Sequence, residues 1–115
     1  MKAIVTGASS GIGREIALLL AECGYDLIIV ARRENLLEEL KNEIRGVNVT
    51  VYPADLRDER ACRELYERFR GDDVEVLVNN AGFGLVGAFD KTSLDTELDM
   101  IHLNIRAVHI LTKLF

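Results

Sequence analysis

The sequence predicts an α/β fold in which a parallel sheet lies between two layers of helices. Short apolar runs alternate with helical patterns four times along the chain. The runs are apolar at nearly every position, which is typical of parallel strands covered on both faces. A glycine-rich turn joins the first run to the first helical pattern. With 115 residues and no repeat, linker or low-complexity segment, we expect a single domain over 1–115.

The first half of the chain contains two strand–helix pairs. Strands are expected over 2–6 (KAIVT) and 25–31 (YDLIIVA), and helices over 12–23 and 34–45, with Gly46 as the stop of the second helix. Helical spacing places these side chains on the inward face of the first helix: Ile12, Ile16, Leu19 and Leu20. It places these on the inward face of the second: Leu36, Leu37, Leu40 and Ile44.

The second half repeats the pattern. Strands are expected over 47–53 and 74–80, a helix over 57–70, and a long helix from Leu94 to the end, after a glycine-rich loop over 82–87. Because crossovers between parallel strands are right-handed, the expected strand order is 3-2-1-4. The whole is a doubly wound, Rossmann-like three-layer αβα arrangement.

The last helix is apolar on more than one face. Either Thr92 or Ser93 is expected to cap it. One apolar stripe consists of Leu94, Leu98, Ile101, Ile105 and Val108, and a second of Met100, Leu103, Ala107, Ile110 and Leu114. One stripe suffices to cover the sheet, and strand 74–80 would be an exposed sheet edge. We therefore expect a homodimer through this helix, the edge strand or both, with a marginal monomer as the alternative.

Composition narrows the range of partners. The net charge of −5 argues against nucleic acid and against an anionic membrane surface. No signal peptide and no membrane helix is expected, and the expected location is cytoplasmic. Cys23 and Cys62 are far apart with no CxxC motif, and both are expected to be buried or half-buried thiols in a reducing environment. His102 and His109 lack further ligands near them in sequence, so no metal site is expected.

The turn after the first strand, TGASSGIG (6–13), carries the clearest chemistry. It enters a helix, whose N-terminal N–H groups and dipole favour a phosphate or pyrophosphate. Gly7, Gly11 and Gly13 allow the backbone to approach a ligand, and the hydroxyls of Ser9 and Ser10 add donors. The spacing G-x-x-x-G-x-G is neither the common dinucleotide fingerprint nor a P-loop. A merely tight turn is the alternative.

Four stretches together resemble the short-chain dehydrogenase/reductase family: TGASSGIG, ADL (54–56), NNAG (79–82) and the Asn104 of HLNIRA. The resemblance implies that the pyrophosphate would be faced by Gly7, Ser9, Ser10, Gly11, Ile12 and Gly13. It implies that Asp55 and Leu56 lie at the adenine, and that Asn79, Ala81 and Gly82 line the ribose and nicotinamide side. Asn104 falls where the family carries its helical active-site asparagine.

Simpler interpretations stay open for the asparagines. The side-chain amides of Asn79 and Asn80 also suit a structural role, in which they pin adjacent loops. The simpler interpretation of Asn104 is a polar residue that is tolerated on a helix.

The end of the second strand bears on the choice of cofactor. A carboxylate there favours NAD, whereas an arginine accommodates the 2′-phosphate of NADP. Ala31 holds the position expected to be acidic, and Arg32 and Arg33 follow it. A guanidinium can clamp a phosphate with two hydrogen bonds, so NADP is favoured over NAD, with Arg32 as the main contact. The alternative is that both arginines are solvated residues at a helix start.

The family's proton relay uses a serine and a Tyr-x-x-x-Lys pair, and this chain lacks them. Four residues after Tyr25, Tyr52 and Tyr66 stand Ile29, Leu56 and Arg70. Among relay residues only Asn104 is present. The chain thus resembles the N-terminal, NADP(H)-binding portion of a carbonyl/alcohol oxidoreductase and is expected to have no turnover by itself. The alternative is a non-catalytic nucleotide-binding or self-association module.

Overall fold

Four parallel strands form the sheet at the centre of the molecule, in the order β3-β2-β1-β4. The computed structural model describes residues 1–115. The strands are β1 (Lys2–Thr6), β2 (Asp26–Ala31), β3 (Val49–Pro53) and β4 (Val74–Val78). Their order and parallel pairing confirm the predicted doubly wound fold.

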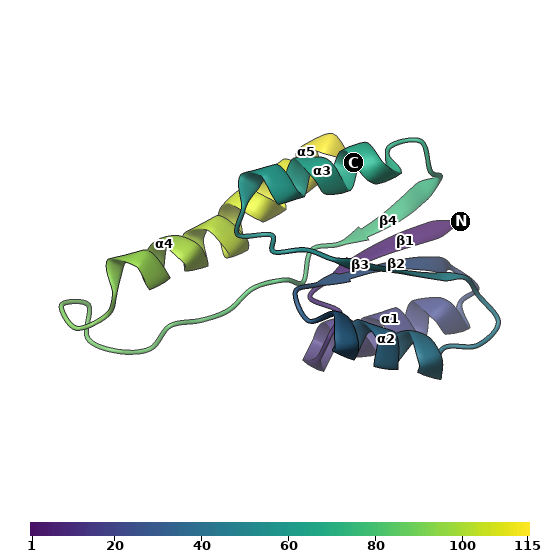
Figure 1. The fold of residues 1–115 in the computed structure, drawn as a ribbon, viewed down its shortest axis with the longest axis horizontal. Coiled ribbons are helices and arrows are strands. Elements are labelled where there is room, and N and C mark those ends of the chain that lie inside the picture. The colour runs from purple at the N-terminus through teal and green to yellow at the C-terminus, as the bar shows by residue number, and fades with distance from the viewer.

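Helices cover both faces of the sheet (Figure 1). In chain order they are α1 (Gly11–Glu22), α2 (Glu34–Glu43), α3 (Glu59–Phe69), α4 (Leu94–Ile101), the π-helical segment η1 (His102–Ala107) and α5 (Val108–Leu114). α1 and α2 lie on one face, while α3 and α5 lie on the other. α4, η1 and α5 form one continuous helix whose α4 end projects beyond the sheet. None of these helices is long and apolar enough to span a bilayer.

The core consists of two apolar clusters, one on each face of the sheet. Successive side chains of a strand point to opposite faces. Val5 and Ile29 therefore pack with α1 and α2, whereas Ile4 and Ile28 pack with α3 and the C-terminal helix. Leu37, Leu40 and Ile44 of the second helical segment are buried as predicted.

The predicted inward face of α1 is wrong at two of its four positions, Ile12 and Leu19, whereas Ile16 and Leu20 are half-buried and Leu20 packs against the core. Ile12 is 74% exposed and Leu19 is 60% exposed, while the buried residues of α1 are Gly13 and Ala17. The helix approaches the sheet through its smallest side chains, and the larger apolar ones flank that contact. Apolar spacing alone cannot reveal this, because a glycine carries no hydrophobic signal.

Gly13 is the point of closest approach. A Cβ at this position would overlap the carbonyl oxygen of Gly7 and the side-chain amide of Asn80. Gly7, with φ of +64°, is similarly crowded, since a Cβ there would lie 2.9 Å from the backbone of Ala81. These two glycines allow the turn after β1 to touch the chain that leaves β4.

Several element ends differ from the prediction for local reasons. β4 ends at Val78 rather than residue 80, because the N–H groups of Asn80 and Ala81 donate to the hydroxyl of Thr6 and not to the ladder. α3 begins at Glu59, because the Asp58 carboxylate accepts a hydrogen bond from the backbone N–H of Arg60 at 2.9 Å. The other strand and helix ends shift by up to two residues.

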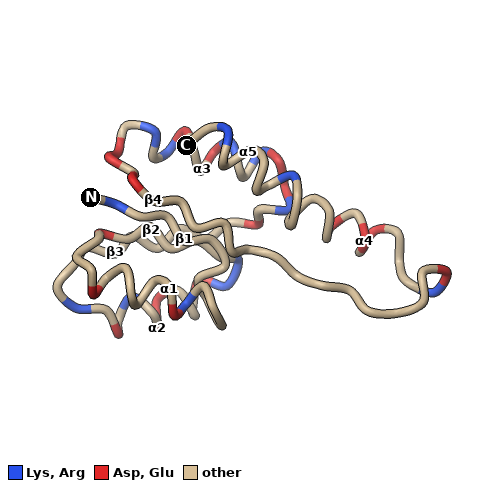
Figure 2. Tube along the Cα trace, turned by 180° about the vertical axis from the view of Figure 1, so that it is seen from behind, with Lys and Arg blue, Asp and Glu red and all other residues tan.

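The C-terminal helix turns one predicted stripe toward the core and leaves the other in solvent. Ser93 caps it, accepting from the N–H of Thr96. Ala107 and Leu111 are buried, whereas the first stripe has exposed fractions of 67% at Leu94 and 63% at Ile105. The connection from β4 to α4 carries no charge before Asp90 (Figure 2). β4 is a sheet edge, as expected.

The contact at Gly13 generates a stability prediction. Gly13→Ala should lower the free energy of unfolding by about 1–3 kcal/mol, the usual cost of overpacking a closely packed site, because both opposing groups belong to fixed loops. Gly71→Ala is the matched control, since nothing lies within 4 Å of a Cβ at Gly71. Urea unfolding followed by circular dichroism measures both. Equal stabilities of the two variants would contradict the close contact.

Candidate functional site

A cavity of about 550 Å³ opens at the carboxyl ends of the strands. This is the edge of an open parallel sheet where ligands bind, because the loops after neighbouring strands meet there. The structure brings together at this cavity most of the predicted site residues: Gly7, Ser9, Ser10, Gly11, Ile12, Arg32, Arg33, Asp55, Leu56, Ala81 and Gly82. Residues from all four strand ends therefore surround one space.

The N-terminus of α1 faces this cavity without a compensating group. Its N-cap residue, Ser10, makes no side-chain cap hydrogen bond, and the first turn of α1 contains no acidic residue. By contrast, α3 and α4 are capped by Asp58 and Ser93 and carry acidic residues in their first turns. The first N–H groups of a helix lack intrahelical acceptors, so this end of α1 presents positive potential to the cavity.

A buried hydroxyl ties the glycine turn to the chain leaving β4. The Thr6 hydroxyl donates to the carbonyl of Val78 at 3.1 Å and accepts from the N–H groups of Asn80 and Ala81, each at 3.0 Å. The Asn80 side-chain amide donates to the carbonyl of Gly7 at 3.1 Å. Asn80 thus pins adjacent loops, as one of the two sequence interpretations held, and it also lines the cavity.

Three predicted residues lie outside the cavity lining: Gly13, Asn79 and Asn104. Gly13 is buried beneath the turn. The Asn79 side chain donates to the hydroxyl of Thr112 on α5 at 3.0 Å. Gly13 therefore acts through close packing, whereas Asn79 joins the end of β4 to α5.

Asn104 holds the loop at the other end of the cavity. Its Oδ1 accepts from the N–H of Phe83 at 3.0 Å, and its Nδ2 donates to the carbonyl of Phe83 at 2.7 Å. Gly82 makes room for it, since a Cβ there would lie 2.8 Å from that Oδ1. Asn104 lies in the π-helical segment η1, a geometry that is frequent at functional sites.

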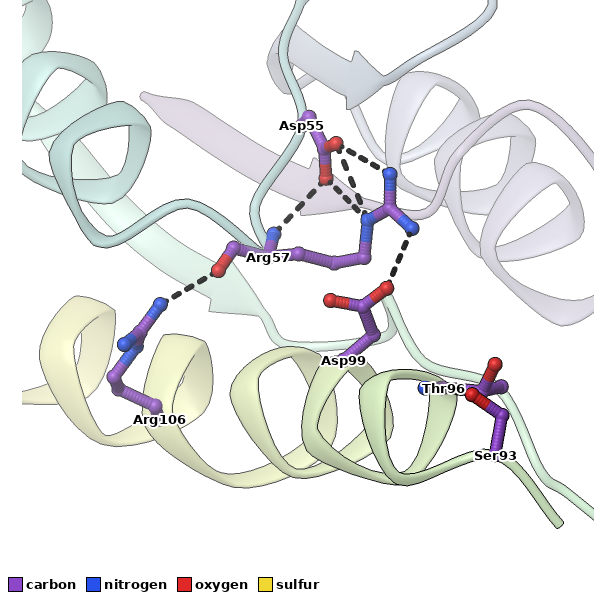
Figure 3. Close-up of polar contacts among 6 residues, drawn as sticks. All are labelled: Asp55, Arg57, Ser93, Thr96, Asp99 and Arg106. Carbon is purple, nitrogen blue, oxygen red and sulfur yellow. Dashed lines mark hydrogen bonds and ion pairs between the residues drawn. The ribbon is translucent and has the colours of Figure 1, made fainter.

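The charged groups of the cavity differ in their pairing. Arg32 and Arg33 are exposed and make no ion pair and no side-chain hydrogen bond. Asp55, in contrast, is bound by the guanidinium of Arg57 (Figure 3). The hydrogen bonds from Arg57 hold the pKa of the Asp55 carboxyl below its usual value, so this carboxylate is ionised at neutral pH.

Sequence reasoning missed several residues of the site. Val30, Phe83 and Leu103 were missed, and together with Ala31 and Ala54 they complete the wall of the cavity with apolar surface. Thr6 and Arg57 were missed as well. The Asp-x-Arg spacing of Asp55 and Arg57 offered a local signal, whereas Thr6 meets its partners across more than 70 residues and offered none. No group of three or more His, Cys, Asp or Glu side chains is placed to hold a metal ion.

Known proteins share both the sequence pattern and the fold of this chain. A family model for short chain dehydrogenases matches residues 1–115. An uncharacterised short-chain type dehydrogenase/reductase of Sinorhizobium fredii is 40% identical over 112 residues, which cover 96% of this chain and 43% of the relative.

Two solved structures are similar over nearly the whole chain. A bulky-bulky ketone specific alcohol dehydrogenase from Comamonas testosteroni superposes with a TM-score of 0.92 at 34% identity, covering 97% of this chain and 46% of that one. A short-chain dehydrogenase from Sphingobium yanoikuyae in complex with NADPH gives the same TM-score, identity and coverage. The chain spans less than half the length of these relatives. The match of the family model over every residue shows that this chain belongs to the short-chain dehydrogenase family.

Proposed function

We propose that this chain is the NADP(H)-binding portion of a short-chain carbonyl/alcohol oxidoreductase. The observation that carries the proposal is the uncapped, carboxylate-free N-terminus of α1, which opens into the same cavity as two unpaired arginines. A pyrophosphate and a 2′-phosphate are the groups that these two features suit. The NADPH bound to the similar Sphingobium enzyme supports this choice of ligand. When bound, the nicotinamide supplies hydride transfer.

In this proposal, different sides of the cavity take different parts of the dinucleotide. The N–H groups at the start of α1 and the hydroxyls of Ser9 and Ser10 bind the pyrophosphate. Asp55 and Leu56 lie at the adenine, and Arg32 and Arg33 take the 2′-phosphate.

The nicotinamide end of the dinucleotide is bound by the loop after β4, where Ala81 and Gly82 line the cavity. Asn79 and Asn104 contribute there by holding that loop, through Thr112 and through the backbone of Phe83. Asn104 is the one residue of the family's relay that this chain carries.

A second candidate, a module that associates with itself, is favoured by one observation. Four large apolar side chains of the C-terminal helix are exposed, at fractions from 40% to 67%: Leu94, Leu98, Ile101 and Ile105. A twofold dimer that packs this stripe against its copy is the simplest closed arrangement. The exposed edge of β4 offers a second surface for pairing. The two functions are compatible, because the cavity lies at the carboxyl ends of the strands, whereas the exposed apolar stripe lies on the C-terminal helix.

Cofactor preference tests the role assigned to Arg32. Arg32→Ala should weaken NADPH binding about tenfold to a hundredfold, corresponding to about 1.5–3 kcal/mol for a charge-assisted contact, and leave NADH binding nearly unchanged. Titration calorimetry measures both constants. Arg60→Ala, which removes the same charge from an exposed position on α3, should change neither. Equal weakening of NADPH and NADH by Arg32→Ala would show that Arg32 is structural.

Turnover tests the catalytic part of the proposal. The 115-residue chain should bind NADPH without oxidising it in the presence of simple ketones or aldehydes, because it contains no Tyr-x-x-x-Lys pair to supply the proton. The absorbance of NADPH at its reduced-nicotinamide band follows the reaction, with heat-denatured protein as the blank. Oxidation above that blank would refute the claim.

Light scattering over a dilution series tests self-association. The chain should have the mass of a dimer, and Ile105→Glu should shift it to the monomer by placing a charge in the stripe. Leu19→Glu is the matched control, because Leu19 on α1 is 60% exposed and Ile105 63%. A monomer mass at every concentration, with the helices intact by circular dichroism, would contradict self-association.

A further inference from the structure

The cavity is lined by charged groups of both signs, of which only the negative one has an ionic partner. Arg32, Arg33 and Asp55 all line it. A carboxylate among arginines ordinarily pairs with one of them, yet Arg32 and Arg33 have no ionic partner. The Asp55 carboxylate is instead held by Arg57, which does not line the cavity. A third arginine, outside the cavity lining, thus holds the one carboxylate that lines the cavity.

Arg57 holds Asp55 by several contacts at once. Its Nη2 donates to Oδ2 at 2.7 Å, and its Nε donates to both carboxylate oxygens, at 3.0 and 3.2 Å. Its backbone N–H also donates to Oδ1, at 3.1 Å. Planar two-point pairs of this kind are strong and directional, so the carboxylate has a fixed orientation.

Arg57 is itself fixed from the other side. Its Nη1 donates to the carboxylate of Asp99 on α4 at 3.2 Å, and Arg106 donates to its backbone carbonyl at 2.6 Å (Figure 3). The guanidinium therefore lies between two carboxylates, one in the cavity and one outside it. This arrangement disfavours any rearrangement that releases Asp55.

Releasing Asp55 would have an electrostatic consequence for its neighbour. Asp55 and Arg32 line the same cavity, and the positive charge of Arg32 contributes, after the larger effect of Arg57, to the lowered pKa of the Asp55 carboxyl. A carboxylate without a partner would attract the guanidinium of Arg32 and repel a phosphate group bound there. NADPH carries that phosphate on its adenosine ribose, and NADH does not. Both dinucleotides share the adenine, so contacts with the adenine affect them equally.

We infer that Arg57 is a specificity-determining residue for the phosphorylated dinucleotide: by holding Asp55 it leaves Arg32 free to bind the 2′-phosphate. The inference rests on the proposed function. Arg57 acts through Asp55 and does not touch the ligand, so it is a positioning residue. Its effect belongs to the ratio of the NADPH and NADH affinities and not to either affinity alone.

The experiment is a double-mutant cycle read out as that ratio. Dissociation constants for NADPH and NADH are measured by calorimetry for the unaltered chain, Arg57→Gln, Asp55→Asn and the double variant. Arg57→Gln should lower the preference for NADPH about threefold to tenfold, the size of one partly solvated charge interaction. Asp55→Asn in the Arg57→Gln background should restore the preference, because the competing carboxylate is gone.

Arg60→Gln is the matched control, since it removes the same charge from an exposed position nearby and should leave the ratio unchanged. If Arg57→Gln does not fold by circular dichroism, Arg57→Lys replaces it in the cycle, with an expected fall of about twofold to threefold, because an ammonium lacks the two-point contact.

The outcomes separate this inference from the function on which it rests. An unaltered ratio in the Arg57 variant, or a fall that Asp55→Asn does not reverse, overturns the role of Arg57 and leaves NADPH binding standing. Equal affinities of the unaltered chain for NADPH and NADH, or no binding of either, overturn the proposed cofactor preference and this inference with it.

Discussion

The close contact between the turn after β1 and the chain leaving β4 determines the shape of the whole site. Gly7 and Gly13 have no Cβ at the points where Asn80 and Ala81 approach them. The Thr6 hydroxyl and the Asn80 amide then join the two segments by hydrogen bonds. Because β1 and β4 are neighbours in the sheet, this contact brings the N-terminus of α1 and the loop at Gly82 to one cavity. A bulkier residue at either glycine would separate them.

Charge is distributed around that contact in a way that favours an anionic ligand. The start of α1 has neither a side-chain cap nor a carboxylate, and Arg32 and Arg33 have no ionic partners. Elsewhere the helices of this chain supply their own compensation, as α3 does with Asp58 and Glu59. The one carboxylate in the cavity, Asp55, is held by Arg57. The fold therefore concentrates unsatisfied positive potential at the cavity although the chain as a whole has a net charge of −5.

The sequence was sufficient to predict the strand order of the sheet and most of the residues that line the cavity. Strand order follows from right-handed crossovers, and the site follows from the topology, which places every loop after a strand at one edge. Ile12 and Leu19 were wrongly predicted to face inward because α1 packs most closely through Gly13 and Ala17, which give a weak or absent apolar signal. Thr6 escaped notice because its partners lie far along the chain. Arg57 is two residues from Asp55, which is a local signal, but its second partner, Asp99, is on another helix. Pairings between distant segments depend on the fold and have no local pattern.

The most direct test of the account is a titration of the isotope-labelled chain with NADPH, followed residue by residue through its backbone amide signals. The account predicts that the largest and earliest shifts occur at Ser10, Gly11 and Ile12, where the N-terminus of α1 opens into the cavity. Smaller shifts are predicted at Arg32 and Ala81, on the other sides of the cavity. Saturating NADPH that leaves the amides of Ser10–Ile12 in place, or shifts only residues of the exposed stripe on α4, would contradict the assignment of this cavity to a dinucleotide.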